Sequence, residues 1–224
     1  INPSLRWDGF TFHYKDGLNN GNAKETQEHT LSPRMNVLFN PTHKWQLYFK
    51  AGRGFHSNDT RVVLTNNDTD ILPAAYGVDL GSVFKIKSKF LVNFAYWCLL
   101  SEQEFVYVGD EGLVEPSGRS NRQGVDLSMR YQLTDWLFWN LDFNYAIART
   151  DGDTGEEFIP LAPDLTSTSG LSAKHPSGFF AGVQARHLSD RPANEDNSIV
   201  AEGYTIVDAN AGMEFKRFQI GVNV

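Results

Sequence analysis

The segment His56-Ser57-Asn58-Asp59, followed by Arg61, is the densest group of side chains suited to holding a small polar ligand. Its imidazole, amide, carboxylate and guanidinium groups offer hydrogen-bond donors and acceptors together. Ser, Asn and Asp also hydrogen-bond their own backbone in turns, and the frequency of these residues in turns favours this second role. We keep His56, Asn58, Asp59 and Arg61 as candidate ligand-binding residues of an exposed loop. One His beside one Asp supplies too few ligands for a closed metal site, so no metal is predicted.

Two further clusters are acidic, one formed by Asp110, Glu111 and Glu115 and the other lying within residues 151–157. Carboxylates suit Ca²⁺, which takes several oxygen ligands. The run Asp151-Gly152-Asp153-Thr154-Gly155, however, lacks the spaced acidic residue that completes a calcium-binding loop. We therefore interpret both clusters as solvated loop surface.

Catalytic motifs are missing from the sequence. It contains no Gly-x-Ser-x-Gly elbow, no His-Glu-x-x-His, no phosphate loop and no pair of cysteines. An enzyme is therefore not expected, and no cofactor is implied. A carboxylate pair of the glycosidase type is a spatial feature, so the sequence leaves that alternative open.

The segments between the loops alternate apolar and polar side chains with a period of two residues. In the segment 136–146, Trp139 and Leu141 fall on one face, whereas Asn140 and Asp142 fall on the other. Such alternation predicts antiparallel strands that present different faces to different surroundings. About eleven strands are predicted, at 10–14, 33–39, 45–51, 76–86, 90–100, 124–133, 136–146, 165–173, 179–185, 205–215 and 218–224.

Charged residues occupy the polar positions of these strands. A Lys or Arg facing lipid at the middle of a bilayer costs about 2–4 kcal/mol, so these residues are expected to face the lumen of a barrel. Pairing across strands is their expected role more often than contact with a ligand. The predicted lumen-facing residues are Lys50, Asp79, Asp126, Arg130, Asp142 and Arg186, with Lys85 in the same row.

The connections alternate between short and long along the whole chain. Membrane barrels have short turns on one side and long loops on the other, whereas Greek-key sandwiches have no reason for such alternation. Aromatic residues follow the short turns, where an interfacial girdle would lie. The short turns are 40–43, 87–89, 134–135, 175–178 and 216–217, and the long loops are 15–29, 55–73, 101–121, 150–163 and 189–203.

Composition narrows the class of protein further. The hydrophobic fraction is 41% and the charged fraction 21%, with a net charge of -7 and no basic stripe, so nucleic acid is not an expected partner. No run approaches the roughly 20 apolar residues of a transmembrane helix, and no signal peptide is visible at Ile1.

Closed bacterial barrels have even strand numbers. An odd number predicts that residues 1–224 are a fragment of one barrel domain whose partner strands lie elsewhere.

Five stretches, in order along the chain, resemble segments of TonB-dependent outer-membrane receptors. They are Ala51-Gly52-Arg53-Gly54-Phe55-His56-Ser57-Asn58-Asp59-Thr60-Arg61, Glu104-Phe105-Val106-Tyr107-Val108-Gly109-Asp110-Glu111-Gly112, Glu115-Pro116-Ser117-Gly118-Arg119 with Gly124-Val125-Asp126, Ile159-Pro160-Leu161-Ala162-Pro163 and Asp190-Arg191-Pro192-Ala193-Asn194-Glu195-Asp196. The closing Gln219-Ile220-Gly221-Val222-Asn223-Val224 is similar to the start of a strand that in this family continues into Asn-Leu-Phe-Asn.

The resemblance implies a partial all-β, antiparallel up-and-down transmembrane barrel in the outer membrane of a Gram-negative bacterium. Family barrels have about 22 strands around an N-terminal plug, which these residues lack. The implied partners are membrane lipid, the plug domain, the remaining barrel strands, TonB acting through the plug, and a small-molecule ligand. That ligand would be a siderophore-bound metal, a cobalamin or an oligosaccharide. The alternatives are a passive porin or surface adhesin, and a soluble β-rich lectin or enzyme.

Overall fold

Every regular element in the computed structural model is a β-strand among the residues that it describes, which are 1–15, 23–57, 71–103, 105–108, 113–116, 118–151 and 157–224. No helix among them is long and apolar enough to cross a membrane. The all-β class predicted from the alternation is therefore confirmed.

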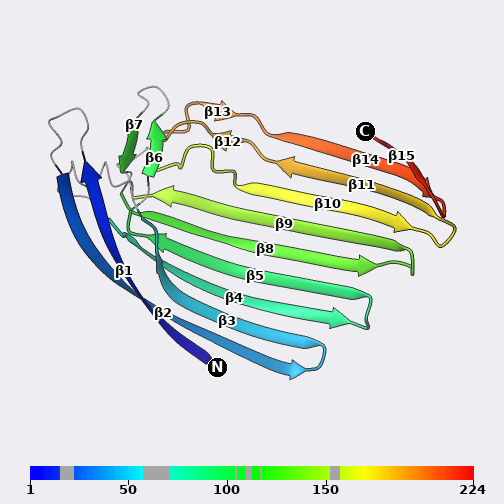
Figure 1. Ribbon diagram of the computed structural model, residues 1–224, viewed down its shortest axis with the longest axis horizontal. Helices are drawn as coiled ribbons and strands as arrows, with labels where there is room; N and C mark the ends of the chain where they lie inside the picture. The colour runs from blue at the N-terminus through cyan, green and yellow to red at the C-terminus, as the bar shows by residue number, and fades with distance from the viewer. Residues whose placement is uncertain (16–22, 58–70, 104, 109–112, 117, 152–156) are drawn as a thin grey trace.

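Eleven strands form one antiparallel up-and-down sheet, which is twisted and curved (Figure 1). They are β1 (Asn2–Lys15), β2 (Ala23–Thr42), β3 (Trp45–Phe55), β4 (Ala74–Ile86), β5 (Phe90–Ser101), β8 (Ser120–Gln132), β9 (Leu137–Thr150), β10 (Leu165–Lys174), β11 (Phe179–Leu188), β14 (Tyr204–Glu214) and β15 (Gln219–Asn223). Within this sheet β1 and β15 are the two edges. The predicted number and order of strands are confirmed.

Two small hairpins lie in segments that the sequence predicts as loops. Strand β6 (Phe105–Val108) pairs with β7 (Leu113–Pro116), and β12 (Arg191–Pro192) pairs with β13 (Val200–Ala201). Each hairpin lies inside a long connection at one end of the sheet (Figure 1). These strands have two to four residues, which is too short for a period of two to stand out.

The prediction of a loop over residues 15–29 is wrong for residues 23–29, which belong to β2. Strands β1 and β2 pair as far as Lys15 opposite Ala23. The residues of β2 before His29 are polar at nearly every position, so the apolar alternation that marks the other strands is missing there. Where both faces of a strand meet water, backbone pairing continues without the pattern that predicts it.

Five tight turns join β2 to β3, β4 to β5, β8 to β9, β10 to β11 and β14 to β15, and all lie at the same end of the sheet (Figure 1). The long connections lie at the opposite end, so the predicted alternation is confirmed. The turn between β10 and β11 depends on Gly178, whose φ of 94° is a left-handed conformation that favours glycine. A Cβ at that position would clash with the carbonyl oxygen of Glu214.

Cross-strand register separates the side chains of the sheet into an apolar face and a polar face, because directly opposed residues point to the same side. Phe49, Leu80, Tyr96, Val125 and Tyr145 form one row across five strands on the apolar face. The next row, on the polar face, consists of Tyr48, Gly81, Ala95, Asp126 and Asn144.

The apolar face is extensively exposed. Among the described residues, five hydrophobic side chains are buried, and no second layer of strands or helices covers this face. The soluble alternative required such a layer. Exposed large hydrophobic residues on the apolar face include Met35, Phe39, Trp45, Val78, Leu80, Phe84, Ile86, Phe94, Tyr96, Tyr131, Tyr145, Leu171, Val183, Val207 and Ile220.

Candidate functional site

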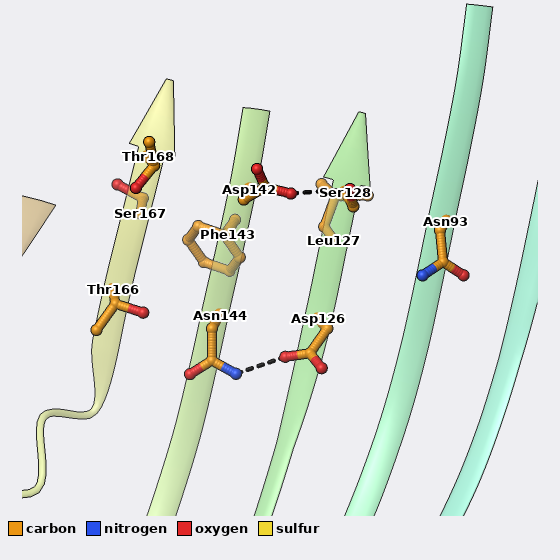
Figure 2. A pocket seen from close by; sticks show the side chains of 10 residues that line it. All are labelled: Asn93, Asp126, Leu127, Ser128, Asp142, Phe143, Asn144, Thr166, Ser167 and Thr168. Carbon is orange, nitrogen blue, oxygen red and sulfur yellow. Dashed lines mark hydrogen bonds between the residues drawn. The ribbon is translucent and has the colours of Figure 1, made fainter. Parts of the chain in front are cut away.

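A hollow of about 330 Å³ lies on the polar face where β5, β8, β9 and β10 run side by side (Figure 2). Register places its side chains in two adjacent rows, because residues two apart on one strand share a face. We name this set the polar hollow, and it consists of Asn93, Asp126, Ser128, Asp142, Asn144, Thr166 and Thr168.

Asp142 is held by two neighbours on β8. Ser128 Oγ donates to Asp142 Oδ1 at 2.8 Å, and Arg130 Nη2 lies 2.8 Å from Oδ2 and 3.0 Å from Oδ1. Arg130 Nη1 also donates to the backbone carbonyl oxygens of Met129 and Leu141. Because these donors already occupy the carboxylate, Asp142 and Arg130 act as a cross-strand brace between β8 and β9.

A second set of bonds joins neighbouring and more distant strands. Asn144 Nδ2 donates to Asp126 Oδ1 across the β8–β9 pair (Figure 2). Tyr48 Oη donates to Asn93 Oδ1 at 3.2 Å, so a side chain of β3 reaches β5 across the intervening β4. It can do so because Gly81 on β4 has no side chain, and a Cβ there would clash with the Tyr48 ring.

Large rings lie over glycines at two other places on the polar face. A Cβ at Gly124 would lie 2.8 Å from the Trp97 ring, and a Cβ at Gly212 would clash with Phe180. An aromatic ring that covers a neighbouring glycine protects the backbone there and helps to fix the register. At these two points the rings lie directly over the backbone of the sheet. No such ring lies over the polar hollow among its lining residues.

The predicted charged row lies on the polar face in full. Lys50 is directly opposite Asp79, and its Nζ lies 4.7 Å from the centre of the Tyr48 ring. Arg186 Nη2 donates to Asp208 Oδ2 at 2.8 Å across the β11–β14 pair. Cross-strand bonding is thus observed for several of these residues, as expected. That this face lines a lumen stays a prediction.

The candidate ligand-binding loop is described only at its ends. His56 is exposed, and its backbone N–H donates to the carbonyl oxygen of Pro73 at 3.4 Å. Asn58, Asp59 and Arg61 lie outside the described residues, so the ligand role of this loop stays a prediction. In the part of the chain that the structure describes, no group of three or more His, Cys, Asp and Glu residues gathers to hold a metal ion.

Two of the long connections contact each other at the opposite end from the turns. The backbone N–H of Phe158 donates to the carbonyl oxygen of Glu195 at 3.0 Å, and that of Leu161 donates to Pro192 at 2.7 Å. The guanidinium of Arg149 lies 4.2 Å from the centre of the Phe158 ring. The two hydrogen bonds join the connection after β9 to the connection after β11, and the Arg149 contact holds the first of these connections against β9.

The connection after β11 is further ordered by Asp196. Its Oδ1 accepts hydrogen bonds from the backbone N–H of Ser198 at 3.0 Å and from the Ser198 hydroxyl at 2.8 Å. These two bonds lower the pKa of the Asp196 carboxyl below its usual value. Asn194 Nδ2 in turn donates to Ser198 Oγ at 2.7 Å, so the turn is stabilised by its own side chains.

Five residues of the polar hollow were not among the predicted site residues, namely Asn93, Ser128, Asn144, Thr166 and Thr168, and neither was Tyr48, which bonds Asn93. Asn93 was visible as the single polar residue inside an apolar strand. The threonines carried no charge and so did not stand out. Parity along each strand gives the face of a residue, whereas its row depends on the cross-strand register.

A comparison with protein families finds a match over the whole chain. The family described as TonB dependent receptor-like, beta-barrel, matches residues 1–224. This agrees with the observed sheet, its two distinct faces and its alternating connections.

Solved structures of low sequence identity share the same fold. The chain superposes on the ferric citrate transporter FecA with a TM-score of 0.82 at 18% identity, covering 99% of this chain and 37% of that one. For the siderophore receptor PiuA from Acinetobacter baumannii, the TM-score is 0.78 at 14% identity, with 99% and 35% covered. For the ferric yersiniabactin uptake receptor FyuA from Yersinia pestis, it is 0.78 at 14% identity, with 99% and 36% covered. The chain therefore spans little more than a third of these proteins.

Proposed function

Since the chain belongs to the family of TonB-dependent receptor β-barrels, we propose that it forms eleven strands of a bacterial outer-membrane receptor that imports a scarce ligand. The observation that carries the proposal is the separation of the sheet into an exposed apolar face and a bonded polar face. Hydrocarbon tails cover the apolar face without needing hydrogen bonds, whereas charges on that face would be costly.

The polar face lines the lumen in this proposal. The candidate lumen-facing residues are Lys50, Asp79, Asp126, Arg130, Asp142 and Arg186. A plug domain occupies the lumen, and TonB acts through that plug. Further barrel strands pair with β1 and β15, because an unpaired edge in lipid leaves backbone groups unsatisfied. The polar hollow supplies donors and acceptors that suit a polar protein surface or bound water.

The ligand class is proposed from chemistry and from the similar structures together. Those structures are described as a ferric citrate transporter, a siderophore receptor and a ferric yersiniabactin uptake receptor, which favours a metal chelate. A cobalamin or an oligosaccharide is the other ligand class for the same loops. His56, Asn58, Asp59 and Arg61 are the proposed contacts, because an anionic or polar chelate needs donors and acceptors above the lumen.

Orientation is tested in intact cells with the full-length receptor carrying Cys98→Ser, to which one cysteine at a time is added. Positions His56 and Ser198 report the long-loop end, and Thr134 and Ser177 report the turn end. A membrane-impermeant maleimide should label the first pair, and the second pair only after the outer membrane is permeabilised. Equal labelling of both pairs in intact cells would contradict the orientation.

Uptake of a radiolabelled ferric siderophore in cells with and without TonB tests the transport step. Import that depends on both this receptor and TonB supports the proposal. A passive porin would instead give TonB-independent uptake and a large steady conductance in planar bilayers.

A further inference from the structure

The tight-turn end of the sheet gathers positive charge that is scattered along the sequence. We name this edge the turn rim and define it as residues 40–44, 85–89, 132–136, 173–178 and 213–218 (Figure 1). It holds seven of the 20 Lys and Arg residues of the chain but two of the 27 Asp and Glu residues. The seven are Lys44, Lys85, Lys87, Lys89, Lys174, Lys216 and Arg217. A chain of net charge -7 thus has one strongly positive edge.

Both carboxylates of the turn rim are already paired. Lys89 Nζ lies 3.2 Å from Asp135 Oδ1, and Lys174 Nζ lies 3.6 Å from Glu214 Oε2. The other five basic side chains are exposed, and none has a carboxylate within ion-pair distance among the described residues. Lys85 lies on the polar face, whereas Lys44, Lys87, Lys216 and Arg217 lie in the turns, where their charge is available to an outside partner.

Aromatic side chains accompany these charges. Phe215 and Phe218 stack with ring centres 4.6 Å apart and flank the Lys216-Arg217 pair. Both rings are exposed, at 47% and 58%. Outer-membrane barrels carry girdles of aromatic residues at both membrane interfaces. Lys and Arg beside them extend their stems along apolar surface and place the charge at headgroup level.

Lys87 gives an independent indication that charge matters at this edge. Its φ is 47°, a left-handed conformation in which Gly or Asn is the ordinary choice. A lysine there is less favourable for the turn itself. Its presence between Lys85 and Lys89 makes this turn the most basic of the five.

We propose that the turn rim binds the anionic headgroups of phospholipids in the membrane leaflet that meets the tight turns. Basic residues close to a membrane attract anionic lipids, and adjacent aromatic rings hold the rim at the correct depth. The inference rests on the transmembrane orientation proposed above. It does not depend on the identity of the imported ligand.

The test compares two variants of the full-length receptor that lose the same number of positive charges. The rim variant carries Lys87→Gln, Lys216→Gln and Arg217→Gln. The matched control carries Lys15→Gln, Arg119→Gln and Arg191→Gln, all at the long-loop end. Each protein in detergent is mixed with equal amounts of phosphatidylglycerol and phosphatidylcholine, and native mass spectrometry counts the lipids that it retains.

Wild type and control should retain phosphatidylglycerol in preference to phosphatidylcholine. In the rim variant, the ratio of retained phosphatidylglycerol to phosphatidylcholine should fall at least about threefold. Raising the salt concentration should weaken the preference, because the charges are exposed. Equal loss in both variants, or no lipid preference in the wild type, would overturn the inference. Unchanged lipid binding with weakened pull-down of a periplasmic protein by the rim variant would assign the rim to a protein partner instead.

The amount of folded receptor on a heat-modifiability gel and the uptake of ligand are measured in parallel. Failure of the lipid-binding inference is therefore distinguishable from failure of the transport proposal.

Discussion

The two faces of the sheet are built from the same strands but are stabilised in different ways. On the apolar face, row after row of Leu, Val and aromatic side chains is exposed. On the polar face, side chains are tied to one another by bonds such as those of Arg130 with Asp142 and Tyr48 with Asn93. A face that meets lipid needs no partners of its own, whereas a polar face loses stability when its bonds are broken. In the proposed orientation, one alternating pattern thus satisfies two different solvents.

The largest expected effect comes from placing a charge on the apolar face. Leu80 is 59% exposed on that face, and Leu38 is 55% exposed on the polar face. Leu38 is opposite Tyr48, which is opposite Gly81, so the two leucines lie at almost the same level of the sheet. Leu80→Arg should lower the free energy of unfolding of the full-length receptor in lipid vesicles by about 2–4 kcal/mol.

Leu38→Arg is the matched control for that substitution and should change stability by about 0.5 kcal/mol or less. Denaturant titration in vesicles, followed by heat-modifiability on gels, measures both. Equal losses in the two variants would mean that the two faces do not meet different surroundings.

The second effect concerns glycines under aromatic rings on the polar face. Gly81→Val should destabilise the barrel by about 1–3 kcal/mol, because the new side chain needs the space of the Tyr48 ring. At Gly77, four residues earlier on β4, a Cβ would meet Leu99 Cδ1 at an ordinary 3.8 Å. Gly77→Val should therefore be nearly neutral in the same unfolding titration. A harmless Gly81→Val would show that the contact between Tyr48 and Asn93 contributes nothing.

The smallest effect is expected for the charged brace. Arg130 and Asp142 are 48% and 49% exposed, so solvent screens their attraction. A double-mutant cycle with Arg130→Gln and Asp142→Asn should give a coupling energy of about 0.2–1 kcal/mol. A coupling well above that range would indicate that a plug or another partner excludes water from this part of the polar face.

Much of the candidate site was accessible from the sequence because strand parity is a local property. The alternation around Asp126, Arg130 and Asp142 is sufficient by itself to assign these three residues to one face. Their neighbours Asn93 and Thr168 were not predicted, because membership of a row depends on which residues oppose each other across strands. The prediction of a loop before His29 in β2 is wrong, since a strand with polar residues on both faces carries no apolar signal.

What the sequence determined alone was the number of strands in the main sheet, their up-and-down order and the residues on each face. All of these follow from a period of two and from the spacing of turns. The tertiary structure decided which distant residues became neighbours. It brought Tyr48 to Asn93 over a glycine and collected seven basic residues from separate turns along one edge. Register is set by backbone pairing between strands, and no single segment of the chain carries that information.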